Sequence, residues 1–243
     1  MRRHRIFVDQ PLSENRTIEL ARDAARYLQQ VLRLKIGHHI RVIDGSGGEY
    51  DADIINVRKQ AVSINVGKHF SDDVESPLNI HIGQGMTRGD RMDYAIQKAV
   101  ELGAATVTPI HTERSLTKLQ SERVARRVQH WQSVSIHAAE QCGRTRIPRI
   151  ESPRELAGWT KTVEADLRLC MNPTADTSLG DVAVAGHRIA LLIGPEGGLT
   201  DDELRIATSA GFIGTRFGPR ILRAETATVV GLSAIQIAWG DLS

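Results

Sequence analysis

The sequence predicts an α/β protein made of a small N-terminal β-barrel followed by a larger domain on a mainly parallel sheet. The chain of 243 residues is long enough for two domains. Apolar residues mostly recur with the period of a strand before residue 70, whereas strand and helix patterns alternate after residue 77. An acidic, polar segment that ends in proline, residues 71–77, separates the two patterns. We therefore expect residues 1–71 to form the barrel and residues 72–243 to form the α/β domain.

The barrel is predicted from short strands and a glycine-rich turn. A helix is expected at residues 23–33, because apolar side chains recur there with helical spacing. The turn at residues 44–48, Asp-Gly-Ser-Gly-Gly, is typical of a hairpin. The predicted strands are residues 5–8, 39–43, 50–57 and 61–66. A small, partly open barrel of this kind is often used to bind nucleic acid.

The larger domain is predicted from strands that alternate with helices. Its strands are expected at residues 78–82, 106–110, 167–171, 189–193 and 215–218. Its helices are expected at residues 90–102, at 121–139, from 200 onward and at 226–239. This order of elements is typical of a parallel sheet with helices on its faces.

The composition excludes several classes of protein. With 41% hydrophobic and 25% charged residues, the chain is neither disordered nor collagenous nor a coiled coil. No apolar run reaches the length of a membrane span and the N-terminus lacks the apolar core of a signal peptide, so we expect a cytoplasmic protein. Cys142 and Cys170 lack metal-ligand spacing and predict neither a disulfide framework nor a metal site.

The net charge of +2 conceals two basic zones. Residues 1–70 hold 12 basic and eight acidic side chains, and residues 111–149 hold eight basic and three acidic ones. Two such zones in a nearly neutral chain predict a local surface that binds a polyanion. For the cluster from Arg123 to Arg127 alone, a solvated helix face is the simpler interpretation.

The segment from Leu191 to Leu204 carries the clearest functional signal. A buried strand ends there in Gly-Pro-Glu-Gly-Gly, and Thr200 with Glu203 predicts a capping box for the next helix. Ligands of open α/β sheets bind at the carboxyl ends of the strands, and glycines let the backbone approach a ligand closely. An ordinary connection needs fewer special residues, so the segment predicts a ligand-binding loop.

Residues 217–227, Phe-Gly-Pro-Arg-Ile-Leu-Arg-Ala-Glu-Thr-Ala, repeat this arrangement at the next strand end. Arg223 and Glu225 either form a salt bridge at the start of a helix or take part in a site. Two Gly-Pro loops on strand ends that we expect to be adjacent favour a shared pocket. The motifs of nicotinamide enzymes, P-loop NTPases, zinc hydrolases and α/β-hydrolases are missing from the sequence, and its nine histidines lack ligand spacing.

These two loops, GPEGGLTDDE and FGPRILRAETA, resemble those of the SPOUT class of RNA methyltransferases. Three further stretches, Lys98–Gly103, Glu140–Arg144 and Val31–Arg33, narrow the resemblance to the bacterial 16S ribosomal RNA (uracil-N3)-methyltransferases, the RsmE family. The resemblance extends over nearly the whole chain. Ala224 stands where related sequences often have threonine, but it lies between the charged positions.

The resemblance implies a PUA-like barrel, a C-terminal α/β domain closed by a deep trefoil knot, and a homodimer whose sites are completed at the subunit interface. It also implies S-adenosyl-L-methionine (SAM) as the methyl donor, cradled by three loops. The implied SAM-binding residues are Leu169, Met171, Asn172, Pro173, Ile193, Gly194, Pro195, Glu196, Gly197, Gly198, Phe217, Gly218, Ile221, Leu222, Arg223 and Thr226.

Methylation of N3 of a uracil requires removal of its proton and stabilisation of negative charge on the carbonyl oxygens. We expect Glu225, or else Glu196, to accept the proton, and Arg223 or Arg144 to hold the uracil oxygens or a phosphate. The partner implied is 16S rRNA, within the small ribosomal subunit or a late precursor. The arginines expected to contact it are Arg2, Arg3, Arg5, Arg33, Arg88, Arg144 and Arg146.

Two alternatives are left open by the sequence. A SPOUT methyltransferase that acts on another base or on tRNA would have the same pocket loops, and only the barrel and residues 140–144 point to 16S rRNA. A non-catalytic RNA-binding or ribosome-assembly factor would tolerate loss of the cofactor loops, and their intact state here argues against it.

Overall fold

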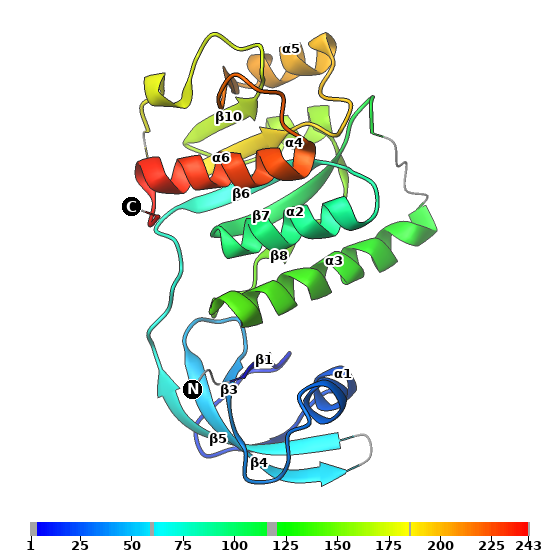
Figure 1. The fold of residues 1–243 in the computed structure, drawn as a ribbon, viewed down its shortest axis with the longest axis vertical. Helices are drawn as coiled ribbons and strands as arrows, with labels where there is room; N and C mark the ends of the chain where they lie inside the picture. The colour runs from blue at the N-terminus through cyan, green and yellow to red at the C-terminus, as the bar shows by residue number, and fades with distance from the viewer. Residues whose placement is uncertain (1–3, 59–60, 116–120, 185, 243) are drawn as a thin grey trace. The chain divides into compact units, whose positions relative to one another are not determined.

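A computed structural model describes residues 4–58, 61–115, 121–184 and 186–242 of the chain (Figure 1). It divides into two compact units. The N-terminal unit comprises residues 1–75 together with residues 139–147, and the C-terminal unit comprises residues 76–138 and 148–243. Each unit has its own hydrophobic core.

The segment 139–147 belongs to the N-terminal unit because its hydrogen bonds lie there. Phe7 N donates to Glu140 Oε1 at 2.8 Å, and the backbone N–H groups of Thr145 and Arg146 donate to Glu75 Oε1 at 3.2 and 3.0 Å. Residues 72–75 and 139–147 were expected to belong to the α/β domain. These contacts join residues about 70 or more positions apart, and no local pattern shows them.

The N-terminal unit is a five-stranded sheet with the strand order β1-β3-β4-β5-β2. Its long central strands, β4 (Glu49–Arg58) and β5 (Ala61–Phe70), are antiparallel, with two irregularities of register between them. β3 (His39–Ile43) pairs with β4 and with β1 (Arg5–Phe7), and β2 (Thr17–Glu19) pairs with β5. β2 was not predicted, since three residues are too few to show a period.

A helical segment covers part of this sheet. α1 (Arg22–Arg26) continues directly into one turn of π-helix, η1 (Tyr27–Val31). The helix expected at residues 23–33 is therefore present but changes its hydrogen-bonding pattern midway. Leu28 is buried against the apolar face of the sheet, which Ile40, Ile54 and Ile64 share.

The C-terminal unit is built on a seven-stranded parallel sheet with the order β12-β10-β11-β6-β7-β8, in which β9 also pairs with β7. The strands are β6 (Asn79–Gly85), β7 (Ala104–His111), β8 (Arg149–Ile150), β9 (Arg154–Glu155), β10 (Leu167–Met171), β11 (Arg188–Ile193) and β12 (Ile213–Thr215). The helices are α2 (Asp90–Glu101), α3 (Ser121–Cys142), α4 (Leu156–Thr162), α5 (Asp201–Ser209) and α6 (Ala224–Trp239), with a 3-10 turn, η2 (Leu179–Asp181).

Helices cover both faces of this sheet, which explains why β11 is apolar along nearly its whole length. α2 and α6 lie side by side over one face, with Met92, Ile96 and Leu232 in the core beneath them (Figure 1). On the other face α4 and α5 enclose Trp159 and Phe212. In the described part of the chain, no helix combines the length and hydrophobicity needed to cross a bilayer.

Two expectations about the sheet are wrong. The last strand is Ile213–Thr215 rather than 215–218, so the Phe-Gly-Pro segment belongs entirely to a loop. β10 lies between β11 and β12, so the two Gly-Pro loops do not follow adjacent strands. Strand order depends on how the chain crosses over the sheet, which local sequence does not specify. The three short elements β8, β9 and α4 were not predicted either.

Candidate functional site

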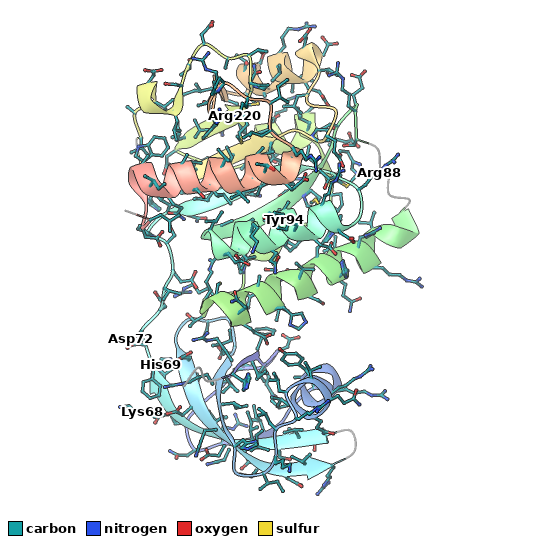
Figure 2. All side chains as sticks on the ribbon, viewed as in Figure 1. Lys68, His69, Asp72, Arg88, Tyr94 and Arg220 are labelled. Atoms are coloured by element: carbon teal, nitrogen blue, oxygen red, sulfur yellow. The ribbon has the colours of Figure 1, made fainter. Side chains whose placement is uncertain are left out.

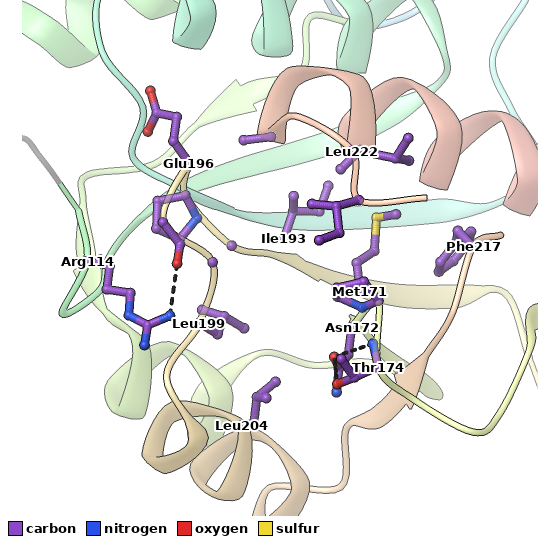
Figure 3. A pocket seen from close by; sticks show the side chains of 18 of the residues that line it. Arg114, Met171, Asn172, Thr174, Ile193, Glu196, Leu199, Leu204, Phe217 and Leu222 are labelled. Atoms are coloured by element: carbon purple, nitrogen blue, oxygen red, sulfur yellow. Dashed lines mark hydrogen bonds between the residues drawn. The ribbon is translucent and has the colours of Figure 1, made fainter. Parts of the chain in front are cut away.

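A cavity of about 390 Å³ lies at the carboxyl ends of β10, β11 and β12 (Figure 3). A pocket of this size at the strand ends of an α/β sheet is the usual place for a small-molecule ligand. Most of its walls come from the segments that follow the three strands. The lining residues are Arg114, Met171, Asn172, Pro173, Thr174, Ile193, Gly194, Pro195, Glu196, Gly197, Gly198, Leu199, Asp201, Leu204, Thr215, Phe217, Gly218, Arg220, Ile221, Leu222, Ala224 and Ala227.

Most of the residues that the resemblance assigned to SAM binding line this cavity, and three do not. Leu169 is completely buried in the hydrophobic core, two residues before its strand ends. Arg223 and Thr226 are exposed at the start of α6 and lie outside the cavity. The expected SAM-binding residues that line the cavity therefore lie at the strand ends and in the three loops.

The loop after β11 is shaped by glycines and then fixed by a helix cap. Gly198 has a φ of +69°, a conformation that favours glycine, and a Cβ on Gly194 would lie 3.2 Å from Leu199. The predicted capping box is confirmed, because Glu203 N donates to Thr200 Oγ1 and Thr200 N donates to Glu203 Oε2. The loop can therefore present its backbone groups to a ligand in one conformation.

Arg114 is a lining residue that the sequence analysis did not assign to the site. It follows β7, and its Nη1 donates to the carbonyl oxygen of Gly197 at 3.0 Å. The neighbouring Glu113 N donates to Glu203 Oε1 at 2.8 Å, so this segment is attached both to the glycine-rich loop and to the first turn of α5. The only signal in the sequence was the basic zone at residues 111–149.

The other two loops complete the walls. Asn172 Oδ1 accepts hydrogen bonds from Thr174 N and Thr174 Oγ1, which closes a tight turn after β10. Figure 3 shows Leu222 beside Ile193 and Met171, which together form an apolar wall. Ile221 is 88% exposed although it is apolar.

Glu196 lines the cavity, and beside it lie Arg91 and Glu225, which are not lining residues. Arg91 Nη1 is 3.4 Å from Glu196 Oε1, and Arg91 Nε is 4.0 Å from Glu225 Oε1. Arg88 N donates to Glu196 Oε1 at 3.2 Å. Figure 3 shows the Glu196 carboxylate pointing away from Leu199 and Leu204. The structure thus brings together the two expected proton acceptors around an arginine that the sequence analysis did not single out.

Arg144 was expected to act in catalysis or RNA binding, and the structure instead buries its side chain beside Glu75. Its side chain is only 7% exposed, and its Nε and Nη2 donate to Glu75 Oε2 at 2.9 and 2.6 Å. This buried ion pair belongs to the N-terminal unit and holds the segment 139–147 in place. In the sequence Arg144 is one of several basic residues between positions 111 and 149, and no local pattern indicates that Glu75 is its partner.

The other expected RNA contacts differ in their availability. Arg33 is exposed, and so is Arg88, whose side chain projects from the ribbon (Figure 2). Arg5 forms an ion pair with Glu49 at 2.8 Å, and its side chain is 21% exposed. This pair links two strands of the N-terminal sheet, β1 and β4. Arg146 is also exposed, and its backbone N–H donates to Glu75 Oε1. Arg2 and Arg3 lie outside the described residues.

Two ionisable groups outside the cavity have strongly shifted pKa values. Burial lowers the pKa of His81 to about 4. The carboxylate of Glu151 raises this pKa, whereas the positive charges of Arg149 and Arg154 lower it further. Burial also raises the pKa of the Cys170 thiol to about 12, which makes it a poor nucleophile. Neither group lines the cavity.

The chain matches two known domain families in the order in which its units occur. Residues 20–66 match the RNA methyltransferase PUA domain, and residues 74–236 match the RNA methyltransferase domain. The chain combines a PUA-like domain with a parallel sheet that has a loop-lined cavity at its strand ends. It therefore belongs to the class of RNA methyltransferases with an N-terminal PUA domain.

Comparison with individual proteins narrows the class. The chain is 32% identical to ribosomal RNA small subunit methyltransferase E of Buchnera aphidicola, over 98% of each chain. A Neisseria gonorrhoeae structure of the same enzyme with bound SAM is 33% identical with a TM-score of 0.94, and a Legionella pneumophila protein with bound SAM is 36% identical with a TM-score of 0.97. Both structural matches cover 100% of each chain. The chain belongs to the ribosomal RNA small subunit methyltransferase E family.

Proposed function

We propose that the protein transfers a methyl group from SAM to N3 of a uridine in the 16S rRNA of the small ribosomal subunit. The observation that carries this proposal is the cavity at three strand ends, which is lined by Glu196 and has Arg91 and Glu225 beside that carboxylate. Membership of the methyltransferase E family supports the reaction class, and the two similar structures with bound SAM support the donor.

The residues of the cavity fit SAM. Ile193, Leu199 and Leu222 offer apolar walls to an aromatic ring. Gly194 lines the cavity without a side chain, and a Cβ there would press on Leu199, another lining residue. The exposed backbone groups of these loops are suited to reading a polar edge of the ligand. When bound, SAM supplies an electrophilic methyl group on a sulfonium sulfur.

One of the two carboxylates, Glu225 or Glu196, is assigned to accept the N3 proton of the uracil. A neutral uracil N3 is a poor nucleophile, so its proton must leave as the bond to the methyl carbon forms and the carbon–sulfur bond breaks. We assign this proton to Glu225, with Glu196 as the second candidate. Glu225 Oε2 is buried and has no hydrogen-bond partner among the described residues. Arg223, exposed at the start of α6, is assigned to the uracil oxygens or a phosphate.

RNA binding is assigned to the exposed arginines. Arg88 and Arg220 lie near the cavity, and Arg33 is exposed on the N-terminal unit. The target base must leave its stack, because N3 is on the pairing edge. Phosphate contacts of this kind make the affinity for RNA decrease with salt. Neutralising Arg33 and Arg88 is therefore expected to weaken binding at low salt.

We also infer that the protein acts as a homodimer in the cytoplasm, on the small subunit or a late precursor. The inference of a dimer follows from the family resemblance, and the exposed Ile237 on α6 and Ile221 just before it are apolar side chains that a partner subunit would cover. Light scattering tests the dimer directly. A monomer at micromolar concentration would contradict it.

The test of the function is methyl transfer from labelled SAM to small subunits from cells that lack this enzyme, with the labelled nucleotide mapped by mass spectrometry. A single N3-methyluridine in 16S rRNA is expected. Label in tRNA or on another base would instead support the wider SPOUT alternative. A non-catalytic assembly factor would give no incorporation at all, and a melting temperature unaffected by SAM would favour it further.

A further inference from the structure

Arg91 occupies a position that its own helix does not favour. It is the second residue of α2, where the positive end of the helix dipole disfavours a cation. Its guanidinium instead lies between two carboxylates, 3.4 Å from Glu196 Oε1 and 4.0 Å from Glu225 Oε1. The position of Arg91 is therefore explained by these two side chains and not by the helix.

The two carboxylates share one pattern. The Oε1 atom of each faces Arg91, whereas the Oε2 atom of each is buried and has no hydrogen-bond partner among the described residues. A buried acceptor without a donor is unfavourable, and a catalytic role is one of the explanations for such a group in a native protein. An N–H group of a ligand that reached either Oε2 would meet an acceptor already removed from water.

We propose that Arg91 is a positioning residue, which binds Oε1 of both Glu196 and Glu225 and so directs their Oε2 atoms toward the N–H of the acceptor base. The inference rests on the proposed function. It assigns the acceptor base to the part of the site where Glu196 and Glu225 lie beside Arg91. Arg91 acts through the carboxylates and transfers no proton itself.

The test is a double-mutant cycle in the full-length protein. Single-turnover methylation of small subunits is measured for the wild type, Arg91→Ala, Glu225→Gln and the double variant, together with the Kd for SAM and the KM for the subunit. We expect Arg91→Ala to reduce the rate by about 100-fold, the cost of a misplaced catalytic group, while the Kd for SAM changes less than about twofold. Arg91→Lys, which keeps the charge, is expected to recover part of the rate.

The cycle distinguishes positioning from an independent role. If Arg91 acts through Glu225, the double variant is expected to be no slower than Glu225→Gln alone. Losses that multiply in the double variant would overturn the proposal. A rise in the KM for the subunit with an unchanged rate would also overturn it, because that result identifies Arg91 as an RNA contact.

Arg188 provides a matched control. It too lies beside two carboxylates, Asp166 at 2.7 Å and Glu164 at 3.5 Å, and its 44% exposure is close to the 48% of Arg91. It begins β11, at the end of the strand opposite the cavity. Arg188→Ala is expected to leave the rate unchanged. If the wild type itself transfers no methyl group, the proposed function fails, whereas an active wild type with an equally active Arg91→Ala overturns only this inference.

Discussion

Arg114 donates a hydrogen bond from Nη1 to the carbonyl oxygen of Gly197 at 3.0 Å, across 83 positions of the chain. The bond joins the segment after β7 to the glycine-rich loop after β11. A Cβ on Gly197 would lie 2.9 Å from Arg114 Cβ, so the two residues are also in close contact. An arginine in the segment after β7 thus holds the loop that we assign to SAM.

Arg114→Ala is expected to weaken SAM binding by about 10-fold, since one charge-assisted hydrogen bond that preorganises the loop is lost. Isothermal titration calorimetry measures the effect. Arg205→Ala is the control, because Arg205 pairs with Asp202 on the exposed side of α5 and does not line the cavity. Equal affinities of the Arg114 and Arg205 variants would contradict the role of Arg114.

Gly85→Ala is expected to destabilise the protein by about 1–3 kcal/mol and to weaken SAM binding. The new Cβ would lie 2.4 Å from Pro195 N and 2.7 Å from the carbonyl carbon of Gly194, so the loop after β11 would have to move. Gly158→Ala in α4 is the control. No atom lies within 4 Å of its Cβ position, and alanine favours a helix, so this change is expected to stabilise the protein slightly. Denaturant unfolding would reveal both effects.

Glu225→Gln is expected to reduce the methylation rate by about 100-fold or more, because the amide has no basic oxygen to accept the N3 proton. The Kd for SAM is expected to stay the same. A variant with the wild-type rate and pH profile would exclude Glu225 as the proton acceptor and leave Glu196 as the candidate. The matching change Glu196→Gln separates the two carboxylates.

The buried His81 predicts a loss of stability in acid. Its pKa is about 4 in the folded protein and about 6.5 when unfolded, so the unfolded state binds more protons between these values. The free energy of unfolding is therefore highest above pH 6.5 and decreases as the pH falls toward 4, by about 3 kcal/mol at most. His81→Gln is expected to flatten this decrease, and an identical pH dependence in the variant would contradict the assignment.

Glu75→Ala is expected to destabilise the N-terminal unit by about 3–5 kcal/mol, because it leaves the buried Arg144 guanidinium without this carboxylate. Chemical denaturation with a probe in that unit measures the loss. Arg149→Ala removes a pair whose arginine is 71% exposed and is expected to cost less than about 1 kcal/mol. Similar losses in the two variants would show that burial does not set the strength of the Glu75 pair.

The two-part organisation and the two Gly-Pro loops could be predicted from local sequence patterns. β3 and β10 occur at the residues expected, because a run of apolar or alternating residues specifies a strand locally. The Thr200–Glu203 capping box and the Gly-Pro loops were equally readable, since caps and turns depend on residues close in sequence.

The contacts between residues far apart in the chain could not be predicted in this way. β10 lies between β11 and β12, the two strands that precede the Gly-Pro loops. Arg144 is a buried partner of Glu75, and Arg91 lies between Glu196 and Glu225. Arg114 donates a hydrogen bond to Gly197. Each of these contacts depends on how strands and helices pack in space, and a period of two or 3.6 residues contains no information about such pairings.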